Sequence, residues 1–186
     1  MVALSEQLIR VHQALRERLA SLRAEVADGT PAATPGGITS GTTGNSSTDG
    51  NSGNSGNFGP DDLLSHCLGF CTAIHTHHRG EDRQLFPALR EAAPELAPVI
   101  GKLEEDHVLV AGILRQIRDL LAGAAPGAPR EPARLGRELD GLTAILESHF
   151  SFEERRIAAA LDRLSPDARS PGPQFPDVFT PRPAAR

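Results

Sequence analysis

Apolar residues recur at intervals of three and four positions in four long stretches of the chain, the spacing of one face of an α-helix. The first stretch covers residues 2–27 and ends at Asp28-Gly29, which is followed by Pro31. Its apolar face carries Leu8, Leu15, Leu19, Leu22 and Val26. No stretch shows the alternation of a β-strand, so the spacing predicts an all-α fold.

The other three stretches begin and end at ordinary helix signals. Asp61-Asp62 favours a helix start by capping and by the helix dipole, and Pro87 is expected to kink or end that helix. Ser165-Pro166 stops the last one. The apolar faces are Leu63, Cys67, Phe70, Ile74, Leu85 and Leu89; then Ile100, Leu103, Val110, Leu114, Ile117 and Leu121; then Leu135, Leu139, Leu142, Leu146, Ile157, Leu161 and Leu164.

Two segments differ in composition from the helical stretches. Within residues 29–60, the run GITSGTTGNSSTDGNSGNSGNFGP is almost all Gly, Ser, Thr and Asn. Such a segment buries too little apolar area to offset its conformational entropy. We expect a long disordered loop there and a disordered Pro-rich tail at 166–186. The remaining helices predict one domain, residues 1–165, folded as an up-down-up-down four-helix bundle.

Polar residues interrupt the apolar faces at six positions where aliphatic side chains are expected. They are His12, His77, Glu81, His107, His149 and Glu153. If the helices alternate in direction, each histidine lies about 15–17 residues from a shared turn, so all four share one level. Each glutamate follows a histidine by four positions and lies one turn away on the same face. Burying a carboxylate costs several kcal/mol unless it is paired or binds a metal. The six residues therefore predict a metal site inside the bundle.

The donor types narrow the choice of metal. Imidazole and carboxylate suit iron, manganese or zinc, and the set contains no thiolate. Two bridging glutamates and four histidines would give each of two metals four protein donors, leaving positions for dioxygen, nitric oxide or peroxide. A mononuclear centre fits the same residue types.

The motifs resemble the hemerythrin-like, or HHE cation-binding, domain. The resemblance rests on the lone His12, on HHRGEDRQLFPAL, on EEDH and on HFSFEE. It spans about residues 5–165, apart from the expected loop at 29–60. It implies a non-haem centre of two iron ions with the six residues as ligands. Oxygen-carrying members have a second histidine one turn from the first on the third helix, where this chain has Leu103 and Ala111. His78 could replace His77 or add to the ligands.

Other residue types receive structural interpretations. Cys67 and Cys71 are expected to be small buried hydrophobes, and His66 and His75 to be solvated or structural. Phe150 is expected to be core or a dry wall around the metals. Asp82 and Glu154 are interpreted as surface partners of residues four positions away.

Composition limits the classes of partner. The net charge of −5 and the lack of a basic block with interleaved aromatics argue against nucleic-acid binding. No apolar run matches a signal peptide or a membrane span, so the sequence predicts a cytoplasmic protein.

Three functions remain open. A binding or sensing protein for oxygen or a related small molecule ranks first, because the sequence shows open coordination without a substrate-pocket motif. An enzyme consuming peroxide or nitric oxide ranks lower, because no acid–base residue outside the ligands is evident. Iron or zinc handling is the third.

Overall fold

The computed structural model describes residues 3–28, 60–122, 132–164 and 175–179. All regular structure in these ranges is helical, which confirms the predicted all-α class for the part of the chain described. The expected loop at 29–60 lies outside these ranges except for Pro60, which begins a helix. The elements are α1 (Leu4–Asp28), α2 (Pro60–Gly80), η1 (Glu81–Leu85), α3 (Phe86–Ala92), η2 (Pro94–Leu96), α4 (Ala97–Ala122), α5 (Pro132–Leu164) and α6 (Pro176–Phe179).

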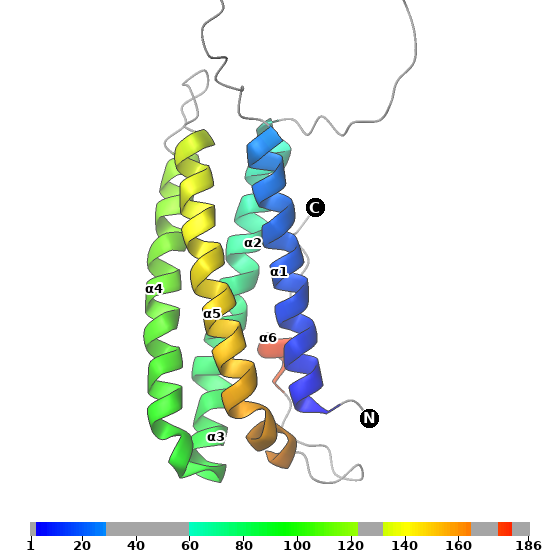
Figure 1. The fold of residues 1–186 in the computed structure, drawn as a ribbon, viewed down its shortest axis with the longest axis vertical. Coiled ribbons are helices and arrows are strands. Elements are labelled where there is room, and N and C mark those ends of the chain that lie inside the picture. Colours follow the sequence, from blue (N-terminus) through cyan, green and yellow to red (C-terminus); the bar gives the residue numbers. More distant parts are fainter. Residues whose placement is uncertain (1–2, 29–59, 123–131, 165–174, 180–186) are drawn as a thin grey trace, which may run out of the picture.

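The long helices lie side by side with alternating directions. In Figure 1, α1 and α4 run upward, whereas α2 with α3 and α5 run downward. Helix α5 packs against both α1 and α4, and α2 also contacts α1 and α4. Each long helix therefore turns one face toward a common interior.

The interior consists of two apolar clusters separated by a polar layer. One cluster, toward the upper end in Figure 1, includes Leu15, Phe70, Ile117 and Leu142. The other, toward the lower end, includes Leu8, Phe86, Leu103 and Leu161. Along the chain, α1 and α4 contribute first to the lower cluster and then to the upper one, whereas α2 with α3 and α5 contribute in the opposite order. Full burial of one such side chain contributes about 1.5–3 kcal/mol, so the clusters can offset the cost of polar groups held between them.

The helix that begins at Pro60 is continued through a π-helical turn and a proline. Residues Glu81–Leu85 form the π-turn η1, in which the Phe86 N–H donates to the Glu81 carbonyl five residues back. Pro87 follows in the first turn of α3, where a missing N–H is tolerated. Of the two alternatives expected at Pro87, a kink or an end of the helix, the end is wrong, because α3 continues past the proline to Ala92.

The prediction of a disordered tail at 166–186 is wrong for residues 175–179. These residues include the short helix α6, whose Val178 is fully buried and is preceded by a buried Phe175. Figure 1 shows α6 beside the lower half of α1, and it contacts both α1 and α2. The apolar residues Phe175, Val178 and Phe179 explain this docking, because they join the lower apolar cluster. The rest of the tail lies outside the described residues.

Residues without a role in the polar layer mostly lie where the sequence predicts. Cys67 and Cys71 are free, buried thiols, and burial raises the pKa of Cys67 to about 12 and that of Cys71 to about 11. His66 and His75 are exposed. Among the described residues, no helix is both long and apolar enough to cross a membrane.

Candidate metal centre

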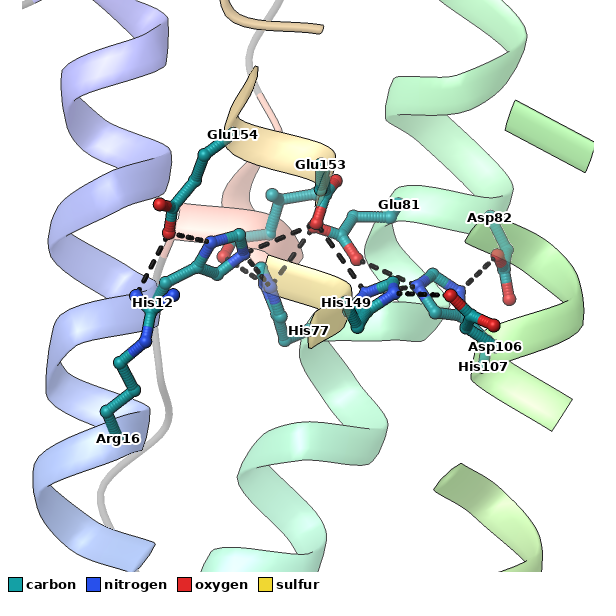
Figure 2. Close-up of polar contacts among 11 residues, drawn as sticks. His12, Arg16, His77, Glu81, Asp82, Asp106, His107, His149, Glu153 and Glu154 are labelled. Carbon is teal, nitrogen blue, oxygen red and sulfur yellow. Dashed lines mark hydrogen bonds and ion pairs between the residues drawn. The ribbon is translucent and has the colours of Figure 1, made fainter. Parts of the chain in front are cut away.

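The six predicted site residues meet in the polar layer between the two apolar clusters. They come from α1, α2, η1, α4 and α5, and each is 5% exposed or less. Figure 2 shows their side chains converging, with Glu81 and Glu153 between the two pairs of histidines. The apolar residues on either side of each polar position hold it at this level. The convergence that the sequence predicts is therefore present.

The first half of the centre pairs His12 with His77. Their Nε2 atoms are 3.1 Å apart. Glu81 Oε1 lies 3.1 Å from Nε2 of His77, and Glu153 Oε2 lies 3.4 Å from Nε2 of His12. The Phe150 ring stacks on His12 with centroids 4.0 Å apart, which makes it part of the dry wall. Two imidazoles and two carboxylates thus point at one small volume.

The second half pairs His107 with His149 in the same manner. Their Nε2 atoms are 3.3 Å apart. Glu81 Oε2 lies 3.4 Å from His107 Nε2, and Glu153 Oε2 lies 3.6 Å from His149 Nε2. Glu81 therefore faces one half with each oxygen, while one oxygen of Glu153 lies between the two halves. The carboxylates are shared, as two bridging ligands would be.

Acceptors outside the centre fix the proton on the outer nitrogen of three histidines. His12 Nδ1 lies 2.9 Å from a Glu154 oxygen that Arg16 also holds at 3.0 Å. His77 Nδ1 lies 3.1 Å from the carbonyl oxygen of Val178. A carbonyl only accepts, so His77 Nδ1 must carry the hydrogen and donate it. An ionised carboxylate likewise only accepts, and the His12 and Arg16 hydrogen bonds hold the pKa of Glu154 low although burial opposes them.

The same logic applies on the other side of the centre. His107 Nδ1 lies 2.7 Å from an oxygen of Asp82 and donates to it. The inner Nε2 atoms of His12, His77 and His107 consequently present lone pairs toward the centre. Two such lone pairs face each other across 3.1 Å in the first half with no hydrogen between them. A metal ion bound by both nitrogens would compensate this arrangement.

The carboxylates are equally uncompensated. Both oxygens of Glu81 and both of Glu153 are buried and have no hydrogen-bond partner among the described residues. Their approaches of 3.1–3.6 Å to histidine nitrogens lack hydrogen-bond geometry. Buried polar groups are almost always satisfied in folded proteins, so four orphaned oxygens at one point indicate a bound ion. The residues fit a metal.

Burial disfavours the charged forms of several groups at the centre. It lowers the pKa of His12, and it holds the pKa of His77 well below its usual value. It also lowers the pKa of His149 to about 3, and the proximity of His107 and His12 adds to that shift. Burial raises the pKa of Glu81 strongly and that of Glu153 to about 8. Neutral imidazole is the form that binds metals, and metal binding would displace protons from the carboxyl groups.

The ligand atoms form two overlapping groups that can hold an ion. One group contains His12, His77 and Glu81, and the other contains His78, Glu81, His107 and His149; in each, the ligand atoms lie within 4.8 Å of one another. The family model for the hemerythrin HHE cation-binding domain matches residues 3–161. The chain belongs to the hemerythrin HHE family. No curated protein and no solved structure matches it. Membership of this cation-binding family and the buried His/Glu groups together show a metal-binding domain.

The hemerythrin match ends before α6, which nevertheless supplies the Val178 carbonyl to His77. Sequence reasoning missed that contact and the outer carboxylates. It interpreted Asp82 and Glu154 as surface partners on their own helices, which is wrong: Asp82 accepts from His107 on α4, and Glu154 accepts from His12 on α1. The available signal was that each directly follows one of the two buried glutamates.

Proposed function

We propose that this protein is a non-haem dinuclear metal protein that binds two iron ions and a small ligand such as dioxygen. The ligands are His12, His77, Glu81, His107, His149 and Glu153. The protein acts in binding or in sensing oxygen, redox state or iron rather than in turnover. Manganese and zinc suit the same donors.

The observation that carries the proposal is the set of inward lone pairs without a donor. Nε2 of His12 and Nε2 of His77 face each other at 3.1 Å, while their outer nitrogens donate elsewhere. The opposite pair, His107 and His149, repeats this approach at 3.3 Å. Two such pairs with two shared carboxylates supply four donors to each of two metals. Iron commonly takes more than four ligands, so positions remain for a small molecule, which a bound ferrous ion would supply with electrons.

Anaerobic reconstitution with ferrous iron, followed by exposure to air, tests the proposal. We expect about two irons per chain and new near-ultraviolet absorption of an oxidised di-iron centre. Substituting His77→Ala or Glu153→Ala should lower the iron content strongly, because each removes an inward donor. The matched control is His66→Ala, since His66 is exposed and bonds to Glu25 away from the centre.

Two results would overturn the proposal. An iron content that stays near zero after reconstitution would remove the metal centre. Equal metal loss in His66→Ala, His77→Ala and Glu153→Ala would show that the ligands are assigned wrongly. Metal analysis of the native protein by inductively coupled plasma mass spectrometry distinguishes iron from zinc.

A further inference from the structure

His78 is a buried histidine at the second half of the centre. It follows His77 directly at the end of α2 and is 5% exposed. Adjacent helical residues point about 100° apart, so the two imidazoles lie on either side of the direction into the bundle. His77 meets His12 of α1, whereas His78 stacks on His107 of α4 with centroids 4.0 Å apart and ring planes 5° apart. The neighbouring histidines therefore serve opposite halves.

The stacked ring leaves one of its nitrogens without a partner. Nε2 of His78 is buried and makes no hydrogen bond among the described residues. A histidine kept only for packing is expected to satisfy this nitrogen, because an unpaired buried polar atom costs about 1–3 kcal/mol.

The position of this imidazole suits coordination. The ligand atoms of His78, Glu81, His107 and His149 all lie within 4.8 Å of one another. Two donors on one metal, each about 2.1 Å from it, can be at most about 4.2 Å apart. The four ligand atoms are therefore near the separation that one ion requires, and the imidazoles of His78 and His107, now stacked, would have to tilt to share it.

We propose that His78 is a third histidine ligand of the metal held by His107 and His149. This inference rests on the proposed dinuclear centre and makes its two metals unequal. The metal at His107 has three imidazoles and two shared carboxylates, whereas the metal at His12 has two imidazoles and the same carboxylates. α2 thus supplies a donor that α4 lacks one turn from His107, at Leu103 and Ala111.

The variant His78→Phe separates coordination from packing. Phenylalanine keeps an aromatic ring against His107 but has no donor nitrogen. The matched control is His75→Phe, the same change at an exposed position one turn earlier on α2. In stepwise titrations of His78→Phe with zinc, we expect one site to keep its affinity and the other to weaken by about 100-fold or more. Loss of a residue that only hydrogen-bonds to a ligand typically costs about 10–100-fold, so loss of a ligand should cost at least as much. The control should resemble the wild type.

A second measurement reads the ligand directly. Cobalt-loaded protein should show a paramagnetically shifted N–H proton resonance for each coordinated imidazole, and His78→Phe should lack one of them. Added free imidazole should restore the weakened site in His78→Ala, because it can occupy the vacated space.

The outcomes distinguish this inference from the proposed function. Two tight sites and an unchanged set of resonances in His78→Phe would refute the role of His78 while leaving the dinuclear centre intact. A wild-type protein that binds fewer than two metals would refute the proposed function, and the unequal pair of metals with it.

Discussion

The two halves of the centre share Glu81 and Glu153 but are enclosed differently. Behind His12 and His77 lie Glu154, which Arg16 holds, and the Val178 carbonyl of α6. Behind His107 and His149 lie Asp82 and Asp106, whose side chains are 40% and 17% exposed. The first half is backed by a neutral carbonyl and a carboxylate paired with arginine, and the second by two carboxylates, of which Asp106 pairs with Lys102 and Asp82 is the more exposed.

This difference would make two metals bound at the proposed centre unequal. Outer acceptors orient histidine ligands and raise their basicity, and a carboxylate does so more strongly than a carbonyl. Glu154 and Asp82 each do so for one histidine, so the halves differ in their second histidine, which faces the Val178 carbonyl in one half and the more distant Asp106 in the other. The half with His12 and His77 should depend more on the position of α6.

The largest effect should come from a residue that both halves share. Glu81→Gln keeps the volume but removes the charge that faces both metals, so metal content should fall from about two ions per chain to nearly none. Glu105→Gln is the control, because its side chain is 74% exposed. Metal-to-protein ratios measure the effect. Retention of one full equivalent would show that the halves are independent sites.

Removing a histidine from one half should have a smaller effect. His12→Ala and His149→Ala each delete one inward nitrogen, so each variant should retain about one metal per chain. Spectra of the singly loaded proteins should differ, because the remaining halves have different surroundings. Identical spectra from the two variants would contradict the comparison.

The outer carboxylates should matter less than the inner ligands. Glu154→Gln and Asp82→Asn each replace an acceptor of a histidine hydrogen, and such changes typically lower metal affinity by about 10–100-fold. The Glu154 change should be the larger, because its carboxylate is less exposed and is fixed by Arg16. Competition with a chelator measures both affinities. A larger loss from Asp82→Asn would contradict this ranking of the two carboxylates.

The smallest effect should follow removal of α6. A chain ending after Gly172 loses the Val178 acceptor and the buried Phe175, so the half with His12 and His77 should weaken by about 10-fold. The half with His107 and His149 should be unchanged. Dissociation rates of the two metals can be followed separately with chelator. Equal acceleration at both would mean that α6 stabilises the bundle without favouring one half.

Side-chain patterns predicted the helices and the inward donors well. His12, His107, His149 and Glu153 replace apolar residues in regular three- and four-residue spacing, which fixes both their burial and their level. The π-turn was not predicted, because it depends on which backbone groups bond. Its trace is the run of four-residue steps from His77 through Glu81 and Leu85 to Leu89.

Contacts that depend on tertiary docking were also beyond the pattern. α6 is too short to show periodicity, and only the apolar residues Phe175, Val178 and Phe179 among prolines hinted at it. His78 lies beside the centre of its helical face, so spacing alone left its role open. Asp82 and Glu154 looked like surface acids because their partners belong to other helices.

The π-turn at Glu81–Leu85 means that the number of residues in this segment cannot change without disturbing the packing that follows it. Each residue advances a helix by about 100°, and the wide turn absorbs one extra residue between Glu81 and Phe86. A single-residue deletion within 82–85 would restore an ordinary helix but rotate Phe86 and Leu89, both fully buried, away from their cluster. Substitutions in this segment should therefore be better tolerated than changes in its length.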